Sequence, residues 1–460
     1  MSSYPEHPLS YRQEIAAPIF RNILSGESCV VIGAASMAKS NLVKFIQRPD
    51  VQAYYLGDLA AHTLLVLVDT NRLAEVEFSD WVAYELILNS LVEASYTAPQ
   101  ALRLPQMLGD LHRDLTLHRD RLLAQRYLER AIRLICTENS LRLAIIIDDA
   151  DPLYQAVSAS FLNNLRALRD MYKYHLCYIL FTRQPLEDIG NSPKSESFYE
   201  LFNRNVLGLK PYQPVDAMRV IEQQEIRKQF HLTAAQRAWL VSFSGGHSGI
   251  LVAAFDLLAK GWRIDETQPE KWLREPTLNE ECQKLWKSLN TDEHWMLVRL
   301  QAGLEGENPE EHPILQALIH KGLICQDQED HWRIFSPLFD RYVQLAGQDA
   351  ADDFHLDEVT ASVWVAGRQT APLTQLEYRL IKVLYQNRGQ VLGRDLLLQA
   401  LYPKEFSQSN PTFNPQDNRV DNLIRRLRNK IESNPGQPRY ILTRRGHGYL
   451  LKPASGEEEE

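Results

Sequence analysis

Residues 33–40, "GAASMAKS", have the frame of a phosphate-binding loop, G-x-x-x-x-G-K-[ST], with one position changed. Gly33 opens the frame and Lys39-Ser40 close it, but Ala38 stands where the pattern has glycine. In such a loop, backbone N–H groups and the lysine bind phosphate oxygens, while the hydroxyl binds a cation. We therefore expect Gly33, Ala38 and Lys39 to bind ATP or ADP, and Ser40 to hold Mg²⁺.

Two adjacent acidic residues could bind the metal ion that accompanies the phosphates and position the attacking water. In "LAIIIDDAD" (143–151), five apolar residues run directly into Asp148 and Asp149. A buried parallel strand that ends in acids presents them to a ligand at its carboxyl end. Asp148 is expected to position Mg²⁺ and its water, and Asp149 to orient or deprotonate the attacking water. The alternative interpretation is a strand followed by an Asp-rich turn.

A third strand-like run, "LCYILFTR" (176–183), ends in Arg183. A guanidinium at a strand end can stabilise the charge on a γ-phosphate during transfer. A surface arginine that happens to follow a strand is an equally good explanation, and the sequence leaves both open.

The segments around these residues predict how they are positioned. An apolar run precedes the loop, a helix start follows it, and "TLLVLVDTN" (63–71) is a further strand. Long helical patterns at 81–95 and 120–138 separate the strands. This alternation predicts an α/β P-loop NTPase fold with a doubly wound parallel sheet.

Ala38 bears on how the nucleotide is used. Alanine adds a methyl group beside the phosphates, and a positive φ there costs about 1 kcal/mol or more. We therefore expect weakened binding and slow or absent turnover, so the protein is an enzyme only as a slow ATPase.

A basic block near the C-terminus stands out in a chain of net charge −9. Between residues 416 and 452 there are nine Lys/Arg against three Asp/Glu. The helix expected at 417–434 has one apolar stripe, and the polar residues off that stripe suit reading of a DNA major groove. The alternative is a solvated face. The off-stripe residues are Arg419, Asn422, Arg425, Arg426 and Asn429.

Residues of about 10–345 resemble a STAND-type P-loop ATPase, a class related to AAA+ proteins. The resemblance rests on the loop, the Asp-Asp strand end, the Thr-Arg strand end, and "SFSGGHSGILVAAFDLL" (242–258). It implies a helical lid in which His247 lies near the nucleotide, although Ser248 replaces the family's proline. "HKGLI…WRIFSPLFDRYV" (320–343) resembles the winged helix that closes such modules.

Residues of about 357–453 closely resemble the DNA-binding domain of OmpR/PhoB-type response regulators. The matching motifs are "LTQLEYRLI", "VDNLIRRLRNKI" and "PRYILTRRGHGYLL". The resemblance implies that Arg425 and Arg426 contact bases and phosphates and that Arg445 enters a minor groove. It also implies that Thr443 and Arg444 face the DNA backbone.

The expected organisation places the nucleotide-binding part of the chain before the DNA-binding domain at 357–453, which we call the reader. A net charge of −5 between residues 301 and 345 argues against DNA binding by the first winged helix, which we expect to pack as a mobile lid. The expected domains are the ATPase (1–215), a helical lid (216–275), an acidic winged helix (276–346), a linker (347–356), the winged-helix DNA-binding domain (357–453) and an acidic tail (454–460).

Together these features predict a nucleotide-switched bacterial transcriptional regulator, whose ATP or ADP state controls oligomerisation and DNA binding. The alternatives are a DNA-dependent ATPase of replication-initiator or defence type, and a pseudo-ATPase scaffold. Expected partners are double-stranded DNA and further copies of the chain, with RNA polymerase or a signalling protein as candidates. Five widely spaced cysteines and the lack of a long apolar run favour the cytoplasm, with no membrane contact.

Overall fold

The chain forms two compact units, which we describe separately. One comprises residues 1–290 and 314–341, and the other comprises 291–313 and 342–460. No helix in the part of the chain covered by the structure is long and apolar enough to cross a membrane. The computed structural model describes residues 7–73, 79–98, 101–189, 195–264, 269–301, 312–327, 331–350, 354–358, 361–365, 368–403, 418–432 and 434–453.

A five-stranded parallel sheet forms the centre of the first unit, in the order β2-β3-β4-β1-β5. Every residue of β1 and β4 is buried, as in a parallel sheet covered on both faces. The predicted α/β fold and its four apolar strands are thus confirmed. The strands are β1 (Cys29–Ile32), β2 (Thr63–Asp69), β3 (Arg142–Asp148), β4 (Leu176–Thr182) and β5 (Val206–Gly208).

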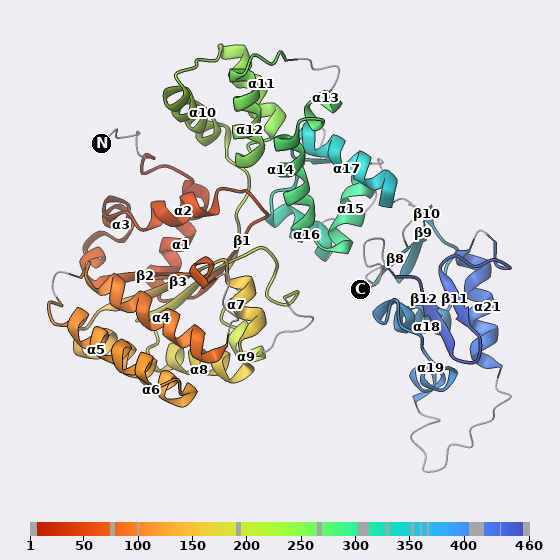
Figure 1. The fold of residues 1–460 in the computed structure, drawn as a ribbon, viewed down its shortest axis with the longest axis horizontal. Helices are drawn as coiled ribbons and strands as arrows, with labels where there is room; N and C mark the ends of the chain where they lie inside the picture. Colours follow the sequence, from red (N-terminus) through yellow and green to blue (C-terminus); the bar gives the residue numbers. More distant parts are fainter. Residues whose placement is uncertain are drawn as a thin grey trace. The chain divides into compact units, whose positions relative to one another are not determined.

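Helices cover this sheet, and α4, α5 and α6 pack against one another beside it (Figure 1). Their apolar side chains share one core with strands β2, β3 and β4. The helices of this part are α1 (Gln13–Ser25), α2 (Lys39–Ile46), α3 (Pro49–Leu56), α4 (Asp80–Ser95), α5 (Leu104–Leu117), α6 (Arg121–Arg133), α7 (Ala150–Ala156), α8 (Ala159–Met171) and α9 (Glu196–Tyr199). Short helical turns lie at Gly57–His62, Thr70–Leu73 and Leu134–Glu138.

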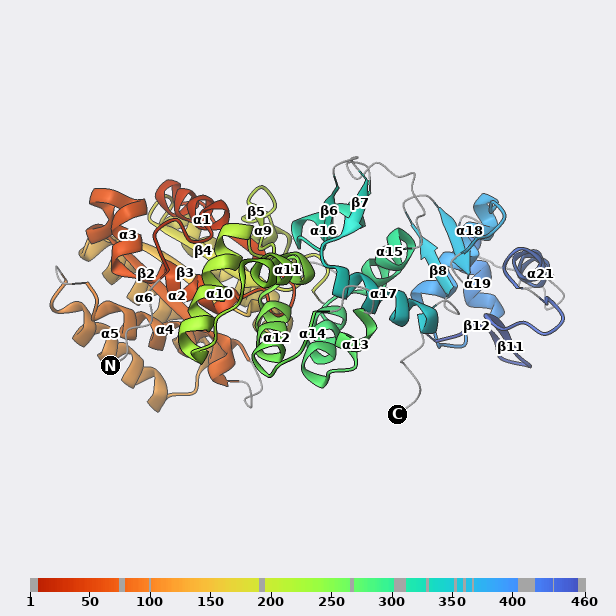
Figure 2. The ribbon, with the colours of Figure 1, turned by 90° about the horizontal axis from the view of Figure 1, so that it is seen from above.

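The rest of the first unit is mostly helical and packs on the end of the sheet (Figure 2). Ser336 Oγ donates to the Phe243 carbonyl at 2.9 Å, and a Cβ at Gly245 would lie 2.3 Å from the Phe335 carbonyl oxygen. Residues 335 and 336 of the acidic segment therefore pack closely on the end of α11. The elements of this part of the first unit are α10 (Pro214–Lys228), α11 (Ala234–Ser244), α12 (Ser248–Ala259), α13 (Pro269–Leu273), α14 (Pro276–Lys287), α16 (Pro313–His320), β6 (Ile324–Gln326), β7 (Trp332–Ile334) and the start of α17 (Pro337–Ala350).

The second unit contains the residues expected to bind DNA and two parts of the acidic segment, helix α15 (Thr291–Gln301) and the end of α17 from Tyr342 onward. The Trp295 ring on α15 stacks on His355 at a centroid distance of 4.0 Å and meets Trp364 edge-on at 5.4 Å. The remaining elements are the antiparallel strands β8 (Phe354–Asp357), β9 (Ser362–Val365) and β10 (Arg368–Gln369), the helices α18 (Gln375–Gln386), α19 (Arg394–Leu401) and α21 (Arg419–Ile431), and the hairpin β11 (Ile441–Arg444) and β12 (Gly448–Leu451).

The observed elements differ from the expected boundaries in two places. Helix α17 continues to Ala350 and β8 begins at Phe354, so the segment expected as a linker is helical at one end and extended at the other. The acidic segment is divided, because 291–313 belongs to the second compact unit. The acidic tail and the loop 404–416 lie outside the described residues.

Candidate functional site

The loop 33–40 joins β1 to α2 at the carboxyl edge of the sheet, where β1 lies between β4 and β5. Ligands of open parallel sheets bind at such edges. Gly33 packs so closely that a Cβ would lie 2.9 Å from Leu209 Cβ. Ser36 and Ala38 are left-handed, with φ of 55° and 57°, and Ala38 caps the start of α2. The strained backbone expected at Ala38 is therefore present.

The predicted charged residues meet beside this loop. Lys39 Nζ lies 3.0 Å from Asp149 Oδ1 and 3.4 Å from Asp148 Oδ1. Arg183 Nη2 lies 3.2 Å from Asp149 Oδ2. The side chain of Arg183 thus pairs with one of the acids while remaining 54% exposed, and this contact favours the functional interpretation of the arginine. The structure brings the four residues from three different strand ends into one cluster.

Two residues that the sequence analysis missed hold the acids and the arginine in place. Thr70 Oγ1 donates to the carbonyls of Asp148 and Asp149, at 3.0 and 2.8 Å. Asp151 accepts the backbone N–H of Arg183 at 3.0 Å. Burial raises the pKa of Asp151, and the N–H of Arg183 opposes that shift.

The acids fit a divalent cation. Asp148 Oδ1 is buried and accepts no hydrogen bond within the described ranges, although it lies near Lys39 Nζ. Burial raises the pKa of Asp148, while the Lys39 ammonium opposes this shift. A buried carboxylate oxygen without a donor is a ligand that Mg²⁺ would satisfy. Among the described residues, no three His, Cys, Asp or Glu side chains form a complete metal cage, so such a cation would also need phosphate oxygens or water.

His247 lies behind the loop. It is fully buried and caps α12, where its Nδ1 accepts the Ile250 N–H at 3.2 Å. Its Nε2 therefore carries the proton and donates to the Ala35 carbonyl at 3.0 Å. Burial lowers the pKa of His247 to about 4, so the ring is neutral near pH 7. The side chain joins the lid to the loop, and its role as a nucleotide ligand stays a prediction.

Arg12 also connects the loop to a neighbouring segment of the first unit. Its guanidinium donates to the Met37 carbonyl at 2.8 Å and to the Lys210 carbonyl at 2.7 Å. It also lies 4.1 Å from the centroid of the Tyr212 ring. No motif surrounds Arg12 in the sequence, so only the tertiary structure reveals this contact.

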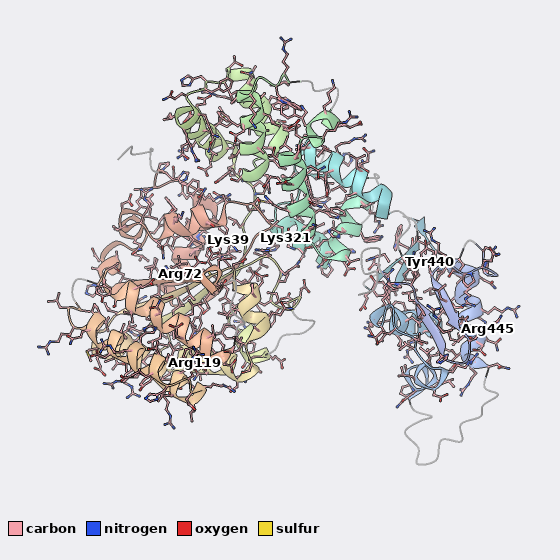
Figure 3. The ribbon with its side chains drawn as sticks, viewed as in Figure 1. Lys39, Arg72, Arg119, Lys321, Tyr440 and Arg445 are labelled. Carbon is pink, nitrogen blue, oxygen red and sulfur yellow. The ribbon has the colours of Figure 1, made fainter. Side chains whose placement is uncertain are left out.

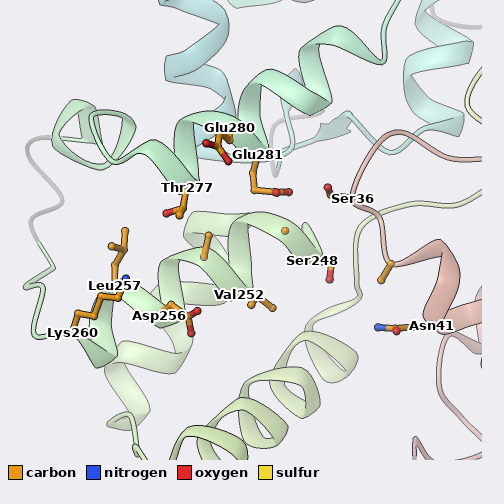
Figure 4. Close-up of a pocket in the computed structure, with 13 residues that line it drawn as sticks. Ser36, Asn41, Ser248, Val252, Asp256, Leu257, Lys260, Thr277, Glu280 and Glu281 are labelled. Carbon is orange, nitrogen blue, oxygen red and sulfur yellow. The ribbon is translucent and has the colours of Figure 1, made fainter. Parts of the chain in front are cut away.

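Two neighbouring pockets open onto the loop and share Ser36, Ala38 and Asn41. The first has a volume of about 550 Å³ and is lined by residues 33–41, Arg183 and the end of α14. The second has a volume of about 470 Å³ and lies between the loop, α12 and α14 (Figure 4). Each falls within the usual size range of small-molecule sites. The second is lined by both apolar and acidic side chains, including Val252, Ala253, Leu257, Asp256, Glu280 and Glu281.

Substituting Ala38 with glycine is expected to tighten nucleotide binding several-fold. Its methyl group lines both pockets, and glycine adopts the observed φ of 57° without strain. Stability should change little, because relieved strain of about 1 kcal/mol is offset by a similar gain in unfolded-state entropy. Isothermal titration calorimetry with MgATP measures the change.

Ala35→Gly is the matched control for Ala38→Gly. Ala35 lies in the same loop but is not among the positive-φ residues, so glycine relieves no strain there. Equal affinity of Ala38→Gly and the wild type would show that the methyl group does not crowd the ligand.

The predicted basic face is present on α21. The residues of its apolar stripe are buried, and the five off-stripe residues named above are exposed. Arg425 and Arg426 have no ion pair or hydrogen bond to other described residues. Arg419 instead lies 4.4 Å from the centroid of the Tyr402 ring.

The hairpin that follows presents a second set of basic residues. Thr443, Arg444 and Arg445 are exposed, and Arg445 lies at the rim of the second unit in Figure 3. Thr443 Oγ1 accepts a hydrogen bond from Arg428 Nη2 at 2.8 Å, and Arg428 also donates to the Ile441 carbonyl. Arg428 was not predicted, and it fastens the hairpin to α21.

Asp421, on α21, joins this helix to two neighbouring elements. Asp421 accepts from Arg394 Nε at 2.8 Å and from the Tyr449 hydroxyl at 2.5 Å. Burial works against ionisation, but these two donors hold the pKa of Asp421 below its ordinary value. Helices α19 and α21 and strand β12 are thereby joined.

The family described as "Transcriptional regulatory protein, C terminal" matches residues 368–451, which span β10 to β12. The C-terminal part of this chain belongs to that family. Helix α21 and the hairpin of β11 and β12 both fall within the match. The DNA-binding domain of RstA from Klebsiella pneumoniae, solved in complex with the RstA box, is 32% identical. That match covers 22% of this chain and 91% of the RstA domain, with a TM-score of 0.19.

The first unit resembles P-loop ATPases. A Walker-type ATPase of Pyrococcus abyssi is 14% identical over 74% of this chain and 99% of that one, with a TM-score of 0.44. The ORC2 protein of Aeropyrum pernix in its ADP form is 13% identical over 75% and 95%, with a TM-score of 0.40.

Proposed function

We propose that the chain is a transcriptional regulator in which ATP or ADP at the loop controls oligomerisation and, through it, DNA binding. The observation that carries the proposal is the cluster of Lys39, Asp148, Asp149 and Arg183 beside the loop. The same chain carries a domain of the transcriptional regulatory family in which Arg425 and Arg426 of α21 pair with no other described residue. One polypeptide therefore holds both a nucleotide site and a DNA reader.

In the nucleotide site, loop N–H groups and Lys39 would bind the phosphates. The hydroxyl of Ser40, which lines the first pocket, and the carboxylate of Asp148 would bind Mg²⁺. The cation would neutralise phosphate charge. Asp149 would orient water, but its carboxylate is shared between Lys39 and Arg183. A carboxylate held by two cations has fewer oxygen lone pairs left to contact a water molecule, which supports slow turnover.

In the reader, α21 would enter a major groove and the hairpin would reach the adjacent backbone and minor groove. Arg425 and Arg426 would contact bases and phosphates, with Arg419, Asn422 and Asn429 beside them. Thr443 and Arg444 would face the backbone, and Arg445 the minor groove. One such module makes few contacts, so avidity from two or more copies would supply the specific affinity.

Footprinting by the full-length protein on the DNA upstream of its own coding region tests this function. We expect protection that differs between MgATP, MgADP and no nucleotide, and a matching change of oligomeric state in light scattering. Identical footprints and identical mass in all three conditions would refute the switch. DNA-stimulated hydrolysis at many turnovers per second would support the replication-initiator or defence alternative, and failure to bind any nucleotide would support the scaffold.

A further inference from the structure

The C-terminal end of α14 forms one wall of the pocket at the loop. Lys284, Lys287 and Ser288 line the pocket together with residues 33–41. Ser288 Oγ accepts the Ala35 N–H at 3.4 Å, and the Ser288 carbonyl accepts from Gln184 Nε2 at 3.1 Å. These two bonds fix the end of α14 against both the loop and the chain that follows β4.

The cations of this pocket differ in whether they already have partners. Lys39 and Arg183 pair with the acids at the strand ends, and Lys284 Nζ lies 2.7 Å from Glu281 Oε1. Glu281 points toward Ser36 of the loop (Figure 4). Lys287 has no ion pair or hydrogen bond to any other described residue. It is exposed, so its ammonium group can meet an incoming anion without breaking a pair.

An ordinary explanation for the two lysines is the negative end of the α14 dipole, which favours cations in the last turn. That effect does not require the side chains to line a pocket opposite phosphate-binding N–H groups. The dipole end would repel a bound phosphate unless a cation lay between them. Lys287 is placed to be that cation.

We propose that Lys287 binds the phosphate tail of the nucleoside di- or triphosphate, as a cation supplied from outside the loop. The inference rests on the proposed function, because it assumes that the loop holds a nucleotide. An ammonium–phosphate contact is a charge-assisted hydrogen bond, roughly twice as strong as a neutral one. Lys287 therefore adds affinity for the phosphates and none for the nucleoside.

Lys287 lies shortly before the start of the second compact unit in the chain. Thr291, four residues later, begins both α15 and the second compact unit. Within that unit, α15 packs against the reader's antiparallel sheet through Trp295, His355 and Trp364. A phosphate bound to Lys287 would fix the chain that leads directly into the reader. Nucleotide-dependent DNA binding should therefore require Lys287.

The test compares the full-length wild type with Lys287→Gln by calorimetry, using MgATP and adenosine as separate probes. The control is Lys44→Gln, which removes the same charge from an exposed position of α2 outside the pocket. We expect Lys287→Gln to weaken MgATP binding about tenfold and leave adenosine binding unchanged. Lys44→Gln should bind both probes like the wild type.

Three results would overturn the proposal. If Lys287→Gln binds MgATP as tightly as Lys44→Gln, Lys287 does not contact phosphate, although the proposed function stands. If Lys287→Gln weakens adenosine binding as much as MgATP binding, the lysine shapes the pocket and does not bind the tail. If the wild type itself binds neither probe, the proposed function fails together with this inference.

Discussion

Replacing Lys39 with alanine is expected to weaken MgATP binding by at least about 100-fold. The substitution removes the only cation of the loop and leaves Asp148 and Asp149 beside the phosphates, with side chains only 10% and 8% exposed. Breaking a buried ion pair by removing one partner costs roughly 3–5 kcal/mol, since the remaining charge stays uncompensated. Part of this cost falls on folding and part on the bound state, so calorimetry is combined with thermal unfolding of each variant.

A double variant separates the two parts. Lys39→Ala with Asp148→Asn removes the carboxylate that pairs with no cation other than Lys39 among the described residues, so we expect it to unfold at a higher temperature than Lys39→Ala alone while still binding MgATP poorly. Lys44→Ala on the exposed face of α2 serves as the control for the loss of one positive charge. Wild-type affinity in Lys39→Ala would show that the loop is not the phosphate site.

The strands that carry this cluster could be predicted because each is a continuous apolar run. In β3 and β4, six or seven consecutive residues are buried, as they must be when helices cover both faces of a parallel sheet. Strand β5, Val206–Gly208, has only three partly exposed residues and carries no such pattern. The order of the strands in the sheet could not be predicted either, because a strand buried on both faces carries no pattern that identifies the strands beside it.

Local sequence patterns likewise predicted some residues of the candidate site and not others. Lys39, Asp148 and Asp149 could be predicted because they lie at fixed positions relative to a strand or a motif. Arg12 and Lys287 are single residues far from the loop in sequence, and only packing brings them to it. Nothing in their local sequence distinguishes them from the other arginines and lysines of the chain.

The reader was predictable in greater detail, since its signals are local. The capping box of α18 is present, with Thr374 and Glu377 bonded to each other's backbone N–H groups. The interactions that escaped prediction join different elements, such as the Arg428 bonds to the hairpin and the pairing of Arg394 with Asp421. Sequence periodicity fixes which face of a helix is buried, but not which side chain of a neighbouring element meets its exposed face.

The double substitution Arg425→Ala/Arg426→Ala is expected to lower the affinity of the full-length protein for its own promoter DNA by at least about 30-fold. Both guanidiniums are exposed on α21 and have no partner within the described residues, so their removal breaks no interaction that holds the fold together. Each base or phosphate contact contributes roughly 1–3 kcal/mol, which corresponds to about 5- to 150-fold in affinity.

The salt dependence of binding separates phosphate contacts from base contacts. Removing an arginine that binds one phosphate lowers the slope of log affinity against log salt by about 0.9, whereas removing one that reads a base lowers discrimination between promoter and scrambled DNA. Fluorescence anisotropy at two salt concentrations on both DNAs measures the two effects. Arg379→Ala is the control, because Arg379 is also exposed in the reader but lies on α18.

If the double variant matches Arg379→Ala in affinity, salt slope and discrimination, α21 does not bind DNA. The basic face would then be only a solvated surface, and the proposed transcriptional role would have no recognition helix to support it. An unchanged thermal unfolding transition in the double variant ensures that any fall in affinity comes from the missing guanidiniums and not from unfolding. Because the buried stripe of α21 anchors this helix in the reader's core, removal of the two exposed arginines should leave that transition in place.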